Sequence, residues 1–247
     1  MDRLVYTALS GLKGQMDAQA TIANNIANAS TIGFRADRVN FERLMVQGDG
    51  HDSRQPSAET VVDMDRRAGA ITQTGRGLDI AITGENWLAV QAADGSEAYT
   101  RRGDLRIAPS GVLETGDGFP VMGSGGPITV PPHDKIVIAD DGTISIVPPG
   151  ADPSQPPQIL DQLKLVSDQG STTVKGLDNL LHVRGGGALP QDMEAKVQTG
   201  ALEQSNVNLT QALVDMIENQ RSYEVQANLL REAKSMDESA ASLMRVS

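Results

Sequence analysis

The chain has 247 residues, no cysteine, and a formal net charge of -11 from 21 basic and 32 acidic side chains. The lack of cysteine excludes disulfide scaffolds, thiol enzymes and Cys-ligated zinc sites. The acidic balance argues against binding to nucleic acid or to anionic membranes, because both need a basic surface. With 39% hydrophobic residues the chain can bury a core, and its length predicts one or two domains of ordinary size.

The N-terminal sequence does not resemble a secretory signal. Only the mostly apolar stretch from Leu4 to Leu9 precedes Ser10, whereas a signal needs about 7 to 15 apolar residues and a cleavage site. No window approaches the ~20 consecutive apolar residues of a membrane span. We therefore expect no membrane insertion, and a cytosolic protein unless it leaves the cytosol without a cleaved signal.

Periodicity predicts a helix over about residues 3–29. Apolar side chains recur there at alternating steps of four and three residues, which is typical of a helix that packs against other helices. These seam residues are Val5, Leu9, Leu12, Met16, Gln19, Ala23 and Ile26. The last turn should be less secure because it holds three asparagines, and Gly33 is expected to end the helix.

The middle of the chain reads as β structure, preceded by residues 46–74, where we expect an extended linker with room for a hairpin. Short apolar or alternating runs bounded by turn residues predict antiparallel strands. The runs are 78–82, 87–90, 135–138 and 143–147. Asp94-Gly95 and Asp141-Gly142 are good turn dipeptides. The proline-rich stretch 148–157 predicts a surface loop.

A second helix is predicted over residues 209–244, about 50 Å long at 1.5 Å per residue. Asn208, with Gln211 three residues later, resembles a capping box at its start. The same spacing of four and three residues defines its seam: Leu209, Leu213, Met216, Gln220, Tyr223, Ala227 and Leu230. The apolar stripe continues to Met236.

Together these elements predict an α+β chain in which long N- and C-terminal helices form a coiled-coil layer, with a central, mostly antiparallel β domain. The expected segments are an assembly helix, a linker, the β domain, a return segment and a second assembly helix, at 1–33, 34–74, 75–190, 191–207 and 208–247. Two helices from one chain leave apolar surface exposed, so copies or relatives of the chain are the natural partners. The alternative is that both helices fold back onto the β domain.

No pattern in the sequence marks a catalytic, cofactor or metal site. The histidines, His51, His133 and His182, are widely separated and lack ligand spacing. The glycine-rich stretch 116–126 matches neither dinucleotide nor P-loop signatures and leads into Pro127 rather than a helix. The calcium-loop and serine-nucleophile motifs are missing as well. We expect a protein that is not an enzyme and needs no cofactor.

Specific strings resemble the bacterial flagellar axial proteins, the family of rod, hook and hook-associated subunits. Residues 23–35, ANNIANASTIGFR, are similar to its signature ANN-[LI]-AN-x-x-T-x-GF-[KR]. Later blocks also resemble it in order along the chain: LDIAI at 78–82, YTRRG at 99–103, and GALEQSNVN at 200–208 followed by Met216, Gln220 and Tyr223. The strings at 1–8, 90–99 and 126–131 look most like proximal-rod members. Distal-rod or hook-type members are the nearest alternative.

The resemblance implies a structural subunit of a hollow drive shaft that transmits torque and encloses an export channel. It implies assembly with copies of itself and with other rod proteins, in a basal-body rod crossing the periplasm. It also implies passage through the flagellar type III export apparatus, which uses no cleaved signal. A periplasmic protein that binds or cleaves peptidoglycan is the rival of a different class, without a sequence feature in its favour.

The expected assembly interface combines the two helix seams with the signature residues. On the N-terminal side it comprises Val5, Leu9, Leu12, Met16, Ala23, Asn24, Asn25, Ile26, Asn28, Gly33 and Phe34. On the C-terminal side it comprises Leu209, Leu213, Met216, Gln220, Tyr223, Ala227 and Leu230. Gln19 and Gln220 are polar at seam positions, which costs stability but can fix register between neighbours.

Overall fold

A computed structural model describes residues 2–43, 57–151 and 156–245. The chain divides into two compact units. We call the first, from residues 1–27, 37–64 and 207–247, the helical unit, and the second, from residues 28–36 and 65–206, the β unit. The chain therefore passes from one unit to the other several times. Residues 28–36 belong to the β unit, although the segments on either side of them belong to the helical unit.

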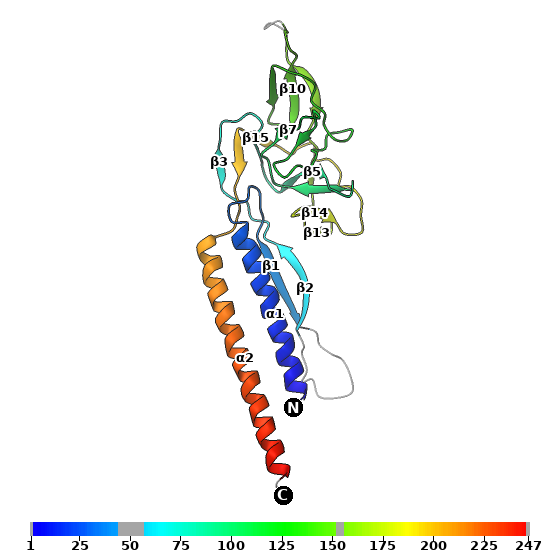
Figure 1. Ribbon diagram of the computed structural model, residues 1–247. Coiled ribbons are helices and arrows are strands. Elements are labelled where there is room, and N and C mark those ends of the chain that lie inside the picture. Colours follow the sequence, from blue (N-terminus) through cyan, green and yellow to red (C-terminus); the bar gives the residue numbers. More distant parts are fainter. Residues whose placement is uncertain (1, 44–56, 152–155, 246–247) are drawn as a thin grey trace. The chain divides into compact units, whose positions relative to one another are not determined.

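The helical unit contains two antiparallel helices, α1 (Asp2–Ala27) and α2 (Leu209–Arg245), which lie side by side in Figure 1. α2 starts as predicted, because Asn208 Oδ1 accepts the backbone N–H of Gln211 at 3.1 Å. The reciprocal half of the capping box is replaced, since the Gln211 amide donates to Asp215 Oδ1 at 2.8 Å. α1 ends two residues earlier than the predicted Ala29, in keeping with the asparagines that follow its apolar stretch.

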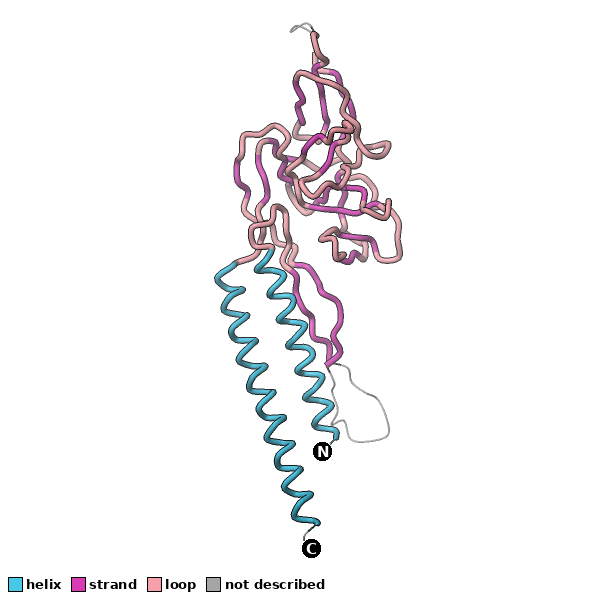
Figure 2. The backbone as a smooth tube through the Cα atoms, viewed as in Figure 1, coloured by secondary structure: helices cyan, strands magenta, loops and turns pink. Residues whose placement is uncertain are grey.

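A hairpin of β1 (Asp37–Arg43) and β2 (Ser57–Met64) completes the helical unit and runs along α1 (Figure 2). The Asn25 side chain attaches the hairpin to the helix, because its amide bonds to the backbone of β1 as a residue of a neighbouring strand would. Its Oδ1 accepts the N–H of Asp37 at 2.8 Å, and its Nδ2 donates to the Asp37 carbonyl at 2.9 Å. Asn24 adds a bond from Nδ2 to Asp37 Oδ2 at 2.9 Å. Residues that weaken the helix therefore hold the next element in place.

The β unit is built from small sheets, and every strand pair within the described residues is antiparallel. The largest sheet has the order β12 (Leu165–Ser167), β5 (Asn86–Gln91), β6 (Glu97–Thr100), β14 (Leu181–Val183), β13 (Thr173–Lys175). The second has the order β11 (Gln158–Gln162), β10 (Thr143–Val147), β9 (Lys135–Ile138). Three strand pairs remain: β15 (Val197–Thr199) with β4 (Ile80–Ile82), β16 (Ala201–Glu203) with β3 (Ile71–Gln73), and β7 (Arg106–Ile107) with β8 (Leu113–Glu114).

Much of the core of the β unit comes from the runs that the sequence marks as strands. Ile80, Leu88, Val90, Ile138 and Ile144 from these runs are all buried in one apolar cluster. The turns at 94–95 and 141–142 connect β5 to β6 and β9 to β10, as their dipeptides predict. Of the predicted proline-rich loop, residues 152–155 lie outside the described residues. Residues 65–74 and 191–206, expected as linker and return segment, are part of the β unit.

The predicted coiled-coil layer is wrong. The described residues form sixteen strands and only two helices, so the chain is mostly β in its elements, and no long coiled-coil layer is evident among them. The spacing of four and three residues specifies an apolar stripe on a helix, but it does not specify what covers that stripe. α1 and α2 form a single pair, and the hairpin takes part of the surface of α1 that further helices would occupy.

Candidate assembly surface

Polar side chains make hydrogen bonds between α1 and α2. Asn219 Nδ2 donates to the Gln15 carbonyl at 2.9 Å and to Gln19 Oε1 at 2.8 Å, and Gln15 Nε2 donates to Ser222 Oγ at 2.7 Å. Four residues earlier on α1, Gly11 allows a close approach: an added Cβ would lie 3.3 Å from Gln226 Oε1. The apolar seam residues are therefore not all used within the pair.

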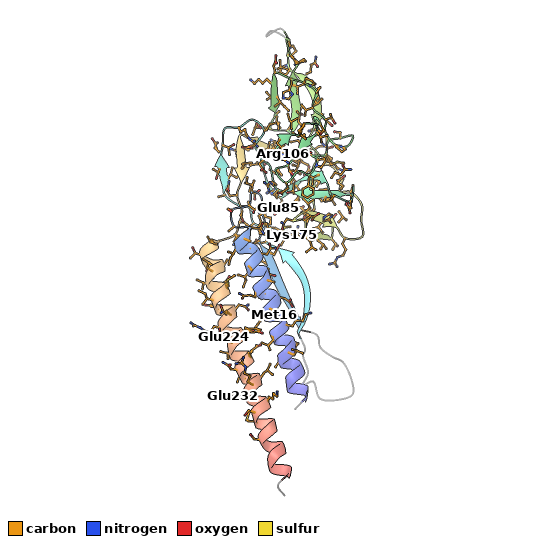
Figure 3. All side chains as sticks on the ribbon, viewed as in Figure 1. Met16, Glu85, Arg106, Lys175, Glu224 and Glu232 are labelled. Atoms are coloured by element: carbon orange, nitrogen blue, oxygen red, sulfur yellow. The ribbon has the colours of Figure 1, made fainter. Side chains whose placement is uncertain are left out.

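A groove of about 440 Å³ lies between the two helices. Its lining is uncharged and includes small alanines beside amides, a methionine and a tyrosine. The lining residues are Gln15, Met16, Gln19, Ala20, Ala23, Asn219, Gln220 and Tyr223. Met16 is exposed on α1, and Glu224 and Glu232 are exposed charged residues of α2; all three are labelled in Figure 3. A groove with small, uncharged residues at its base can accept another apolar element.

Large apolar side chains are exposed along both helices. On α2 the exposed fractions of eight such side chains lie between 38% and 63%. They are Leu209, Leu213, Val214, Ile217, Tyr223, Val225, Leu229 and Met236. On α1, Leu9 and Met16 are exposed to similar extents. Single exposed apolar residues are common, but a series along one helix is typical of a surface that binds another protein.

The structure divides the expected interface residues of the N-terminal side between different environments. Leu12 and Ile26 are half-buried, Leu9, Met16 and Ala23 are exposed, and the side chain of Val5 lies outside the described part. Asn24 and Asn25 bind the hairpin, as described above. Asn28 Oδ1 accepts a hydrogen bond from Thr31 Oγ1 at 3.1 Å.

Gly33 and Phe34 lie inside the β unit. Gly33 has φ of +67°, and an added Cβ would lie 2.4 Å from the backbone carbon of Arg101. Phe34 is buried, and the Lys175 ammonium lies 3.8 Å from its ring centroid. Both residues therefore have a role within their own chain.

The expected C-terminal residues differ in their exposure along α2. Leu209, Leu213, Gln220 and Tyr223 are exposed, and the last two line the groove. Met216, Ala227 and Leu230 are half-buried. Of the two polar seam residues, Gln19 accepts the bond from Asn219, whereas Gln220 is exposed at the groove.

The β unit contains a buried ion cluster that the sequence reasoning missed. Glu203 contacts two arginines, with Oε1 2.6 Å from Arg35 Nη2 and Oε2 3.0 Å from Arg101 Nε. All three side chains are at most 3% exposed. Desolvation lowers the pKa of both guanidinium groups, and attraction to Glu203 opposes that shift. Each residue lies in a string already noted for its resemblance, but charged residues usually predict surface positions.

The described histidines have ordinary local partners. His133 Nδ1 lies 2.9 Å from the Pro131 carbonyl, and His182 Nε2 lies 3.0 Å from Asp178 Oδ2. His51 lies outside the described residues. Across the described ranges, no group of three or more His, Asp or Glu side chains could hold a metal ion. In the same ranges, neither helix combines the length and the apolar character needed to cross a membrane.

Three protein-family models match the chain in order. A model described as "Flagella basal body rod protein" matches residues 5–35. The "Flagellar hook protein FlgE/F/G D1 domain" model matches residues 81–146, and the "Flagellar basal body rod FlgEFG protein C-terminal" model matches residues 198–243. The first and last of these matches include most of α1 and α2.

Similar curated proteins cover the chain almost completely. The flagellar basal-body rod protein FlgF of Salmonella typhimurium is 38% identical over 253 aligned residues, which span the whole of both chains. FlgF of Escherichia coli is 39% identical over 246 residues, with 97% of this chain and 96% of the relative covered. The rod protein FlgG of Bacillus subtilis is 31% identical, with 93% and 94% covered. This chain thus belongs to the flagellar basal-body rod protein family, on the FlgF side of it.

Proposed function

We propose that this chain is a structural subunit of the flagellar basal-body rod, where it assembles with copies of itself and with related rod proteins. Its role is to transmit torque and to enclose the export channel, without catalysis. The full-length similarity to FlgF proteins supports the identity of the structure in which it works. The chain reaches that position through the flagellar type III export apparatus, and the rod crosses the periplasm.

The observation that carries the assembly role is the exposed apolar surface of the helical unit. Ile217 is 60% exposed and Leu213 is 46% exposed, and both lie on a helix that already has a partner within its own chain. Burying a fully exposed side chain of this kind contributes about 1.5 to 3 kcal/mol, and roughly half of that remains for these half-covered residues. A second subunit that covers this surface gains the remainder, which is not available within the single chain.

The unequal lengths of the helices point the same way. Gln15 bonds to Ser222, and Gly11 lies against Gln226, so extending this antiparallel register places Asp2 opposite Ser235. The described turns of α2 at residues 236–245 then extend past the described end of α1 (Figure 1). Short helical segments are marginal without tertiary packing, so this end of α2 is a natural contact for a neighbouring subunit.

The signature asparagines and the residues at 33–34 have a different place in the proposal. The expected interface included Asn24, Asn25, Asn28, Gly33 and Phe34, and their bonds and burial within the chain support an indirect contribution. They hold the hairpin and the β unit in the form that a neighbouring subunit meets. The direct contacts are assigned to the exposed seam residues Leu9, Met16, Ala23, Leu209, Leu213, Gln220 and Tyr223.

Electron microscopy of basal bodies from cells that lack this chain tests the proposed function. The rod should stop at its proximal part, and a plasmid copy of the chain should restore it. Complete rods of normal length in the deleted strain would contradict the proposal. If the chain were instead a periplasmic peptidoglycan enzyme, the purified protein would cleave isolated cell wall. The rod subunit should lack this activity.

The absence of cysteine allows a direct test of the surface. A single Leu213→Cys substitution, treated in cells with a short thiol-reactive cross-linker, should give adducts with a second rod subunit that carries its own single cysteine. Ser124→Cys is a matched control, because Ser124 is exposed in the β unit. Equal cross-linking from both positions would show that α2 is not a preferred contact.

A further inference from the structure

The end of the last strand of the β unit contacts three segments that occur much earlier in the chain. Residues 203–206 comprise the last residue of β16 and the three residues after it, and they form the final part of the unit before α2. They contact residues 33–36, residues 65–70 and Arg101. Each contact uses either a charged group or a backbone group that would otherwise be without its partner.

The charged contacts centre on Glu203. Its carboxylate is 2% exposed and lies between the guanidinium groups of Arg35 and Arg101. Oε1 also accepts the backbone N–H of Gly69 at 2.8 Å. Asp65 and Asp168 attract these arginines as well, but Glu203 is the largest attractive influence on both. A chain without Glu203 would have to bury two guanidinium groups without their main counter-charge.

Backbone groups of the two earlier segments also depend on this strand. Gly33 N donates to the Glu203 carbonyl at 2.8 Å, and Gln204 N donates to the Ala70 carbonyl at 2.8 Å. Asn206 bonds on both sides: Oδ1 accepts the Ala36 N–H at 2.7 Å, and Nδ2 donates to the Asp65 carbonyl at 3.0 Å. The two early segments also bond directly to each other, since Asp65 N donates to the Ala36 carbonyl at 2.8 Å. Unpaired backbone groups in a folded interior are costly, so residues 203–206 stabilise both segments by supplying their remaining partners.

These segments also pack closely against one another. An added Cβ at Gly69 would lie 1.8 Å from the Gln204 carbonyl oxygen, and one at Gly33 would meet the Arg101 backbone. Residues 203–206 therefore fill space directly beside residues 65–70, and glycine is needed at both close approaches.

We propose that residues 203–206 act as a folding latch for the β unit. A chain that emerges N-terminus first presents Arg35 and Arg101 long before Glu203, so the β unit stays open until nearly the whole chain has emerged. In passage through a narrow channel, the β unit then closes only after residues 203–206 have left the channel. That use rests on the proposed export, whereas the latch itself is a property of the isolated chain.

Folding kinetics of the full-length purified chain test the latch without any rod assembly. Trp87, the single tryptophan, is buried in the β unit with Arg101 5.7 Å from its ring, so its fluorescence reports closure of this unit. Glu203→Gln should slow refolding at least about tenfold while changing unfolding less, as expected when the contact is needed at the rate-limiting step. Glu194→Gln is the matched control, since Glu194 is exposed in the same unit, and it should leave both rates unchanged.

Two further variants keep the test informative if Glu203→Gln does not fold. Asn206→Ala removes bonds to both early segments without burying a charge, and it should also slow refolding. Arg35→Met in the Glu203→Gln background should recover part of the lost stability, because one uncompensated guanidinium is removed.

Unchanged refolding with faster unfolding in Glu203→Gln or Asn206→Ala would overturn the latch, because these contacts would then form after closure. Complete rods in cells that lack this chain, together with refolding rates as expected, would count against the proposed function only.

Discussion

The hydroxyl of Tyr99 accepts the backbone N–H of Leu189 at 2.6 Å, across 90 residues of sequence. The same hydroxyl donates to Glu97 Oε1 at 2.9 Å, and Lys164 pairs with that carboxylate at 2.7 Å. Tyr99 itself is fully buried. Burial raises the pKa of Tyr99 to about 12, with Glu97 adding to the shift and the bond from Leu189 opposing it.

Tyr99 should make the β unit sensitive to alkali. An unfolded tyrosine ionises near pH 10, whereas the folded one stays neutral to about pH 12. The stabilisation that comes from keeping the Tyr99 hydroxyl neutral is therefore fully present below pH ~10, and it is lost as pH rises through the pKa of Tyr99 in the folded protein. Thermal unfolding followed by Trp87 fluorescence should show a steeper fall in melting temperature between pH ~10 and ~12 for the native chain than for Tyr99→Phe. Parallel curves for the two proteins would contradict the assignment.

The same tyrosine predicts a cost at neutral pH. Tyr99→Phe leaves the Leu189 N–H without its acceptor, so the free energy of unfolding should fall by about 1 to 3 kcal/mol. Denaturant titration at pH 7 measures it. Tyr223→Phe is the control, because Tyr223 is exposed on α2 and lies outside the β unit.

Gly33 and Gly75 form a matched pair for testing the packing of the signature segment. Both have positive φ, of +67° and +73°, so alanine at either position costs about 1 to 2 kcal/mol of backbone strain. Only Gly33→Ala also places a Cβ 2.4 Å from the Arg101 backbone, whereas nothing lies within 4 Å of a Cβ at residue 75. Gly33→Ala should therefore destabilise the β unit clearly more than Gly75→Ala in the same titration. Equal losses would mean that residues 28–36 are not held against Arg101 in solution.

The sequence predicted the helices and the principal strands because each carries a local signal. The spacing of apolar residues marked α1 and α2, Asn208 marked the start of α2, and the turn dipeptides marked two hairpins. What covers a helix is not a local property. The stripe on α1 could equally serve a coiled-coil layer, a hairpin or a single antiparallel partner, and the structure shows the last two.

The buried ions were missed for a related reason. Arg35, Arg101 and Glu203 become neighbours only through the pairing of segments far apart in sequence, and charged residues are normally expected at the surface. Asn25 shows the same limit in a different way. Its poor helix propensity was visible in the sequence, but the two hydrogen bonds of its side chain to the Asp37 backbone depend on where the hairpin lies.

Amide hydrogen exchange on a proven monomer should separate the two units. Polar side chains make the described hydrogen bonds between α1 and α2, and much of the apolar surface of α2 is exposed, so both helices should exchange faster than the β unit. Slow exchange should follow the buried strands β4, β5 and β6. Protection of residues 212–240 equal to that of β5 would show that the helices are stable without a second subunit.

Leu213→Asp tests the assembly surface most directly. In the single chain Leu213 is 46% exposed, so the change should scarcely alter the thermal unfolding of the β unit. In the rod, the same change should remove about 1.5 to 3 kcal/mol of leucine burial and add the cost of an unpaired carboxylate at a contact. Cells carrying the variant should therefore export a protein that folds normally yet fail to complete the rod.

Leu177→Asp supplies the matched control for that experiment, because Leu177 is a fully exposed leucine of the β unit, at 108%. Rods built with this variant should be normal, and so should rods built with Leu213→Met, which keeps an apolar side chain of similar size. Normal rods with Leu213→Asp would show that this position is not a contact between subunits. A clear drop in the melting temperature of the β unit with Leu213→Asp would show that α2 stabilises that unit within the chain, and the exposed stripe would then need another explanation.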